Sequence, residues 1–293
     1  MGKPALLVVG HGTRDGAGAA EFAAFIRRLR SRAEGLAVAG GFIELSPPPL
    51  AEAVGELVAA GQRHLVTMPL VLVGAGHAKG DIPGALARER ARHPGTRYSY
   101  GRPLGPHPSL LYLLDERLDA VLDPAERAET AVLLVGRGST DPDANAEVHK
   151  VARLLWEGRS LGYVETAFVS LTRPGTEEGL ERCRRLGARR IVVLPYLLFP
   201  GVLPDRARRQ AEAYQLAHAD LDVRCARVIG DCDGLADLVL ERYEEALVGD
   251  IRMNCDTCIY RAPMPGFEHR LGAAQVAHHH PDDPVEGAHA HHH

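Results

Sequence analysis

The chain contains one internal repeat, which constrains its fold more than any other feature of the sequence. The segment Leu6–Thr13 resembles Val132–Ser139, and the two lie 126 positions apart. Three further pairs of blocks keep this offset to within one residue: Phe42–Leu45 with Phe168–Leu171, Val66–Leu70 with Val192–Tyr196, and Arg102–Gly105 with Arg227–Gly230. Self-similarity at a fixed spacing indicates that one structural unit occurs twice. We therefore expect two homologous halves.

Within each half, short apolar runs alternate with longer stretches of helical period. The expected strands are Leu6–Gly10, Ala39–Leu45, Leu65–Leu70 and Thr96–Tyr100, followed by Ala131–Gly136, Val164–Ser170, Arg190–Pro195 and Val223–Ile229. The expected helices of the first half are Gly18–Arg30, Leu50–Ala60, Pro83–Arg92 and Pro108–Leu122. Alternating strands and helices predict parallel strands joined by right-handed crossovers. The sequence thus predicts an α/β protein with two doubly wound lobes, each built on a four-stranded parallel sheet.

The polar stretch Asp123–Arg127 contains a helix-stopping proline and is the expected junction between the lobes. We predict a first lobe over residues 1–123 and a second over 128–248. Residues 249–293 form an extension rich in His, Ala, Gly, Pro and Asp. Such a segment buries too little apolar surface to fold alone, so we expect it to be flexible.

Charge and composition exclude several functional classes. The net charge of −4, from 34 basic and 38 acidic residues, does not support a coat for nucleic acid or a polybasic membrane anchor. No apolar run reaches the ~18–20 residues that cross a bilayer, and Ala5–Val9 is too short for a signal-peptide core. Five cysteines without an export signal favour reduced thiols or metal ligation over disulfides. We expect a cytoplasmic protein, monomer or homodimer, without nucleic-acid or membrane partners.

Three polar residues of the first half are expected at one edge of its sheet. His11 follows the first strand, Glu44 ends the second and His77 lies in the loop after the third. Open parallel sheets bind ligands at the carboxyl ends of their strands. Two imidazoles and a carboxylate suit a divalent ion such as Co²⁺, Fe²⁺, Ni²⁺ or Zn²⁺, and they equally suit proton abstraction near neutral pH.

The second half keeps the scaffold and replaces the three candidate ligands. Arg137, Ser170 and Leu203 stand at the positions equivalent to His11, Glu44 and His77. The simplest interpretation is a single active cleft with its catalytic residues in the first half.

A dinucleotide site is the main alternative for the first turn. Gly10 and Gly12 are followed by Gly16, which gives G-x-G-x-x-x-G instead of G-x-G-x-x-G, and the acidic residue expected ~20 residues later is missing. The pattern disfavours a nicotinamide cofactor.

Three motifs resemble the class II chelatases of tetrapyrrole biosynthesis, and more narrowly the sirohydrochlorin cobaltochelatases and their ferrochelatase relatives. They are Gly10–Thr13, Phe42–Glu44 and Gly74–Pro83, the last containing His-x-x-x-Asp-Ile-Pro. The segment Pro195–Leu203 resembles the family's degenerate second lobe. This resemblance implies that His11, His77 and Glu44 gather the metal and accept pyrrole protons.

The implied activity is insertion of Co²⁺ into sirohydrochlorin, with Fe²⁺ or Ni²⁺ as alternative metals. The sequence lacks a G-x-x-x-x-G-K-[ST] loop, so the insertion is expected to be independent of ATP. Because sirohydrochlorin carries many carboxylates, cations are expected around the cleft. Five lie in suitable loops, although a solvated surface charge is the simpler interpretation of each: Arg14, Lys79, Arg137, Arg173 and Arg206.

The extension contains Met253–Cys258, with a C-x-x-C at Cys255 and Cys258. This motif alone is redox-active, zinc-binding or incidental. It resembles the Met-x-Cys-x-x-Cys motif of long-form cobaltochelatases, which implies a [4Fe–4S] cluster and favours cobalt. A cubane cluster takes four thiolates, so Cys225, Cys232, another subunit or a non-protein ligand would complete it.

More than half of the fifteen histidines lie between positions 269 and 293. They are either a native metal store or an expression tag, and the interruption over 281–288 favours the former. The same feature supports a non-enzymatic alternative, a metallochaperone or metal-storage protein.

Overall fold

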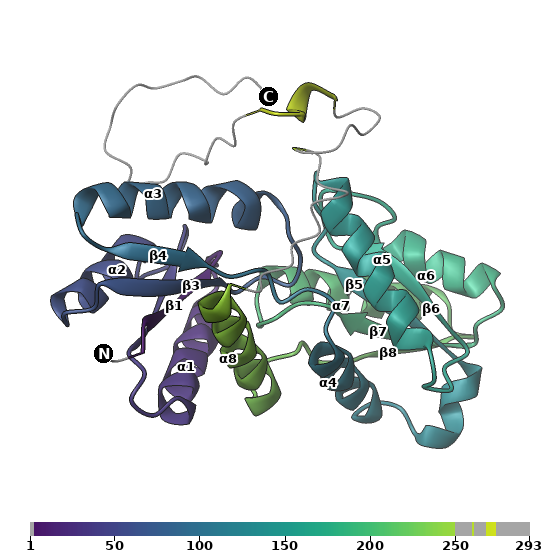
Figure 1. Cartoon of the computed structure of the whole chain (residues 1–293). Helices are drawn as coiled ribbons and strands as arrows, with labels where there is room; N and C mark the ends of the chain where they lie inside the picture. Colours follow the sequence, from purple (N-terminus) through teal and green to yellow (C-terminus); the bar gives the residue numbers. More distant parts are fainter. Residues whose placement is uncertain (1–2, 250–259, 261–267, 274–293) are drawn as a thin grey trace.

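The computed structural model describes residues 3–249, 260 and 268–273, and it has the expected two lobes (Figure 1). The first half consists of β1 (Ala5–Gly10), α1 (Gly16–Arg32), β2 (Val38–Phe42), α2 (Leu50–Ala59), β3 (His64–Pro69), the π-helical turn η1 (His77–Asp81), α3 (Ile82–Arg92), β4 (Arg97–Tyr100) and α4 (Pro108–Asp119). After the 3₁₀ turn η2 (Pro124–Glu129), the second half consists of β5 (Thr130–Gly136), α5 (Pro142–Trp156), β6 (Tyr163–Phe168), α6 (Thr176–Arg185), β7 (Arg190–Pro195), α7 (Val202–Ala217), β8 (Asp222–Cys225) and α8 (Asp233–Val248). A short 3₁₀ turn, η3 (Glu268–Arg270), lies beyond them.

Each lobe contains one four-stranded parallel sheet, as the repeat predicts. The strand orders are β2-β1-β3-β4 and β6-β5-β7-β8. In β1, Leu6 and Val8 enter one apolar cluster while Leu7 and Val9 enter another on the opposite face. Both faces of the sheet are therefore covered, which explains why the central strands are continuous apolar runs.

The last helix of each half packs on the sheet of the other half. Helix α8 contacts β3, β4 and α1 of the first lobe, whereas α4 contacts α5 and β7 of the second (Figure 1). The largest apolar cluster accordingly combines side chains of both halves, among them Phe25, Leu113 and Leu235. The packing thus crosses the sequence boundary near residue 123.

Polar contacts hold α8 to the first half. The guanidinium of Arg242 is buried and donates to the Leu104 carbonyl at 2.9 Å. Glu245 accepts from Arg102 at 2.8 and 2.9 Å, and the Tyr243 hydroxyl donates to the Pro4 carbonyl at 2.6 Å.

Three strands end two or more residues earlier than the sequence predicts. β2 stops at Phe42 and β6 at Phe168 because Leu45 and Leu171 adopt left-handed backbone angles, with φ of 65° and 66°, and turn the chain out of the sheet. β8 stops at Cys225. The chain then leaves the sheet toward α8, and on this path Ile229 N donates to Leu197 O. Within the described residues, none of the helices combines the length and the apolar character that a bilayer-spanning segment requires.

Candidate metal centre

The structure brings His11, Glu44 and His77 together at the carboxyl edge of the first sheet. His11 directly follows β1, and Glu44 lies two residues beyond the end of β2. His77 begins the π turn that leads into α3, so it lies on a helical turn and not in the loop that the sequence predicts. One ligand atom from each side chain lies within 4.8 Å of the other two, close enough for the three to share a metal ion.

His11 presents an unprotonated nitrogen to this cluster. Its Nδ1 lies 3.2 Å from the Gly12 carbonyl, which places the ring proton on Nδ1. Its Nε2 is buried, lies 3.1 Å from Glu44 Oε1 and has no hydrogen-bond partner among the described residues. Burial is the main cause that lowers the pKa of His11 to about 3, and electrostatic interactions with His77 and Arg137 lower it further. The ring is therefore neutral near pH 7, which is the form that binds metals.

Glu44 is held by a close approach of two backbone segments. Gly12 has a φ of 105° and packs directly against the Glu44 carbonyl oxygen, and Glu44 N donates to His11 O at 3.1 Å. The side chain keeps 35% of its surface exposed toward the cavity. A carboxylate oxygen and an imidazole lone pair that face each other at 3.1 Å are two electron-pair donors, and a cation between them would relieve their repulsion.

His77 is oriented by a residue whose role the sequence reasoning missed. Asp81, four residues later, places Oδ2 2.6 Å from His77 Nδ1, and its side chain is only 11% exposed. A carboxylate commonly fixes the tautomer of a metal-binding histidine, so this contact favours a ring proton on Nδ1 and Nε2 as the metal-binding nitrogen. The rings of His11 and His77 meet edge to face at 4.1 Å. The i,i+4 spacing of His77 and Asp81 on one helical turn was the signal in the sequence.

The cluster opens into a cavity of about 1090 Å³ between the two lobes. Its apolar lining comes from both halves and includes the half-exposed Leu45, its repeat equivalent Leu171, and Phe199. Arg14 and Arg137 supply positive charge at the cavity wall. The cavity therefore combines a metal-binding edge, an apolar surface and cations.

The other three candidate cations do not line this cavity. The ammonium of Lys79 is buried between Asp141 and Asp143 of the second lobe. Burial alone would lower the pKa of Lys79, but the hydrogen bonds and charges of these aspartates outweigh it and raise the pKa. Arg206 is exposed on α7.

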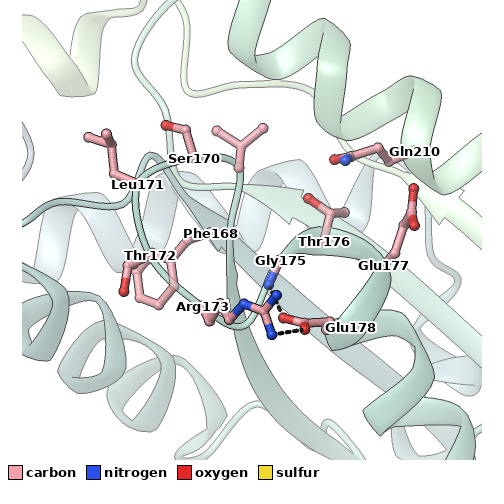
Figure 2. Close-up of a pocket in the computed structure, with 11 residues that line it drawn as sticks. Phe168, Ser170, Leu171, Thr172, Arg173, Gly175, Thr176, Glu177, Glu178 and Gln210 are labelled. Atoms are coloured by element: carbon pink, nitrogen blue, oxygen red, sulfur yellow. Dashed lines mark hydrogen bonds and ion pairs between the residues drawn. The ribbon is translucent and has the colours of Figure 1, made fainter.

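Arg173 lies at a separate pocket of about 450 Å³ beside the second sheet (Figure 2). There it pairs with Glu178 at 3.1 Å. Ser170, the repeat equivalent of Glu44, lines the same pocket and donates its hydroxyl to the Arg137 carbonyl at 3.0 Å. The second lobe thus uses this position for a local backbone contact.

The predicted cluster ligands Cys255 and Cys258 lie outside the described residues. The thiols suggested to complete a cluster are within them. Cys225 packs against the apolar core of the second lobe, where burial raises its pKa to about 11. Cys232 precedes α8 and packs against the central apolar cluster. The [4Fe–4S] cluster stays a prediction.

The sequence of this chain matches the model of one protein family. The CbiX family model matches twice, over residues 5–121 and 131–246. The chain belongs to the CbiX family. The two matches follow the two halves of the repeat.

Individual relatives agree with this assignment. A sirohydrochlorin cobaltochelatase from Priestia megaterium is 39% identical over 87% of this chain and 84% of the relative. A sirohydrochlorin ferrochelatase from the same organism is 31% identical over 83% of this chain and 90% of the relative. Among solved structures, the sirohydrochlorin chelatase SirB from Bacillus subtilis subspecies spizizenii in complex with cobalt superimposes with a TM-score of 0.71 at 29% identity, over 83% of this chain and 95% of that one. This similarity confirms the two-lobed chelatase-like fold.

Proposed function

We propose that this CbiX-family protein is a sirohydrochlorin chelatase that inserts Co²⁺ without ATP. The observation that carries the proposal is the convergence of His11, Glu44 and His77 at the edge of a cavity between two lobes. At about 1090 Å³, the cavity is slightly larger than the ~300–1,000 Å³ usual for small-molecule sites, which suits a large flat ligand. The relatives that carry the names sirohydrochlorin cobaltochelatase and ferrochelatase support the same substrate class.

The proposed mechanism assigns one task to each element of the site. The imidazoles of His11 and His77 take the metal ion from water and hold it at the cavity edge. The apolar wall, including Leu45 and Leu171, packs against the faces of the macrocycle, and Arg14 and Arg137 pair with its carboxylates.

Insertion of one divalent ion releases two pyrrole N–H protons, and a base must accept them. Glu44 has this role in our proposal, because its side chain faces the cavity and retains contact with solvent. It accepts the two protons one after the other and releases each to water. The metal moves from the imidazoles to the ring nitrogens as those protons leave.

Cobalt as the preferred metal is the finer part of the proposal. The cobaltochelatase named above shares 39% identity with this chain, against 31% for the ferrochelatase, and the extension resembles that of long-form cobaltochelatases. Insertion of Fe²⁺ for sirohaem synthesis is the second candidate, since the two histidines and the carboxylate suit both ions.

The test is to mix purified protein with sirohydrochlorin and with Co²⁺, Fe²⁺ or Ni²⁺ in parallel, and to follow the absorption spectrum of the macrocycle. We expect Co²⁺ to give the fastest change and His11→Ala to abolish most of it. A faster change with Fe²⁺ would favour the ferrochelatase. Metal binding without any change of the macrocycle spectrum would instead indicate a metallochaperone or storage protein.

A truncated protein separates the lobes from the extension. Both family matches end by residue 246 and α8 ends at Val248, so we expect a variant without residues 250–293 to fold and insert metal at saturating Co²⁺. If Cys255 and Cys258 hold a cluster, changing both to Ser removes brown iron–sulfur absorbance from the full-length protein. An insoluble or inactive truncated protein would show that the extension is part of the catalytic fold.

A further inference from the structure

We propose that the second lobe, which has lost the three candidate ligands, positions His77 through an ionic anchor. The anchor consists of Lys79 and its partners Asp141 and Asp143. It deepens the proposed function and rests on it for the role of His77, but its test measures metal binding alone.

The anchor is buried and crosses between the lobes. Lys79 Nζ lies 2.6 Å from Asp141 Oδ2 and 3.2 Å from Asp143 Oδ2. The side chain of Lys79 is 8% exposed and those of the two aspartates are 7% exposed. An ammonium group so deeply buried is stable only with partners of opposite charge in fixed places, so the position of Lys79 is tightly defined.

The two aspartates are themselves fixed by the start of α5. Asp141 is the N-cap of this helix and accepts from Asp143 N at 3.1 Å, while the Ser139 hydroxyl accepts from Asp141 N at 3.0 Å. Carboxylates are favoured at this end of a helix, because the first backbone N–H groups carry partial positive charge. The second lobe therefore supplies a rigid acceptor for Lys79.

The anchor acts on the same turn that carries His77. Lys79 follows His77 by two residues, and the π turn closes when Ile82 N donates to His77 O. The turn belongs to the segment 74–82. At the beginning of this segment, Gly74 N donates to Glu147 Oε2 of α5 at 3.0 Å. Helix α5 thus holds the segment on both sides of His77.

The repeat offers an internal comparison. In the second half, Lys79 corresponds to Asp205, which lies 3.8 Å from Arg208 of its own helix. Asp143 corresponds to Ala17 in the first half. The equivalent contact is between the start of α1 and the segment before α7. There the backbones meet directly, since a Cβ added to Gly18 would lie 2.7 Å from the Pro200 carbonyl oxygen. Asp141 is matched by Asp15, so Lys79 and Asp143 are the anchor residues found on the His77 side alone.

The test compares Lys79→Met, Lys79→Arg and Lys150→Met by titration with Co²⁺ alone. Lys150 is exposed on α5, so Lys150→Met removes the same charge without touching the anchor. We expect the Kd for Co²⁺ to rise about 10–100-fold in Lys79→Met, as for other residues that orient a metal ligand. Lys79→Arg should recover most of the affinity, and Lys150→Met should match the wild type.

A double-mutant cycle distinguishes positioning from general destabilisation. If Lys79 acts through His77, then adding Lys79→Met to His77→Ala leaves the Kd unchanged. The Co²⁺ absorption spectrum of Lys79→Met should likewise resemble that of His77→Ala. An unchanged Kd in folded Lys79→Met, or an equal further loss in the His77→Ala background, would overturn the proposal.

If Lys79→Met does not fold, Asp143→Asn takes its place under the same criteria, because it keeps the side-chain shape and leaves Asp141 as a partner. Wild-type protein that binds Co²⁺ but does not metallate sirohydrochlorin would contradict the proposed function and not the anchor.

Discussion

Replacing Gly12 with Ala should remove most of the metal insertion while the protein stays folded. Gly12 has a φ of 105°, and a Cβ added there would lie 1.7 Å from the Glu44 carbonyl oxygen. Because Cβ atoms essentially never come closer than 3.0 Å to a heavy atom outside their own and the adjacent residues, one of the two segments must move by about 1.3 Å. A misplacement of about 1 Å at a reacting group costs roughly 10²-fold in rate, so we expect a loss of about that size.

The repeat supplies a matched control for this change. Gly138 has a φ of 88°, and its added Cβ would lie 1.9 Å from the Ser170 carbonyl oxygen. The two substitutions therefore impose the same kind of strain, about 1–3 kcal/mol for an unfavourable backbone conformation. Only Gly12→Ala displaces a candidate ligand, since the residue at position 170 is a serine.

The assay is the initial rate of sirohydrochlorin metallation at saturating Co²⁺, normalised to folded protein by circular dichroism. Both variants should melt at similarly reduced temperatures. Because Gly138 adjoins Arg137 in the cavity wall, Gly138→Ala is compared with sirohydrochlorin also saturating, where it should change the rate at most a few-fold. The reasoning is refuted if the two variants lose activity equally, or if Gly12→Ala keeps more than half of the wild-type rate.

Three further predictions concern the candidate site and helix α8. His11→Ala and His77→Ala should each abolish most insertion at saturating metal while the circular dichroism spectrum stays native; wild-type turnover in either variant would exclude that residue as a ligand. Glu44→Gln should reduce turnover about 10²–10⁴-fold and alter the pH–rate profile with similar affinity for the macrocycle, because it removes the proton acceptor; an unchanged profile with normal turnover would exclude Glu44. Burial alone would raise the pKa of Glu245. The hydrogen bonds and charges of Arg102 and Arg242 outweigh this effect and lower the pKa below its unfolded value of about 4.3. The stabilisation is therefore present above pH ~4.3 and is lost as the pH falls through the lower, folded pKa, so Glu245→Gln should cost about 1–3 kcal/mol in denaturant melts at pH 7 and less in acid; an equal cost at both pH values would contradict this.

The arrangement of the candidate site could be predicted from sequence because it depends on local patterns and one topological rule. The apolar runs of β1, β2 and β3 predict parallel strands, and parallel strands end at a common edge. His11, Glu44 and His77 each follow one of these strands, so their convergence needs no knowledge of side-chain packing. The repeat further indicated that one half carries the candidate ligands, since Arg137, Ser170 and Leu203 replace them in the other.

The details of the strand ends and turns were less accessible. The left-handed conformation of Leu45 ends β2 early, although an apolar residue at that position predicts a continued strand. The π turn at His77 depends on contacts from Asp81 and from α5, which lies in the other lobe.

The sequence by itself thus determined the repeat, the two parallel sheets and the residues at the edge of the first. Hydrophobic period can be recognised within a few neighbouring residues, and the repeat can be recognised by comparing the two halves. The tertiary structure decided which sheet each last helix covers and which charges are buried. α4 and α8 present similar apolar faces, and two homologous sheets offer similar surfaces, so local pattern does not choose between them. A lysine in a segment that the sequence predicts as a loop, such as Lys79, predicts a solvated charge, and it is buried only because Asp141 and Asp143 approach from a distant part of the chain. Such contacts join residues more than sixty positions apart and depend on how the lobes dock.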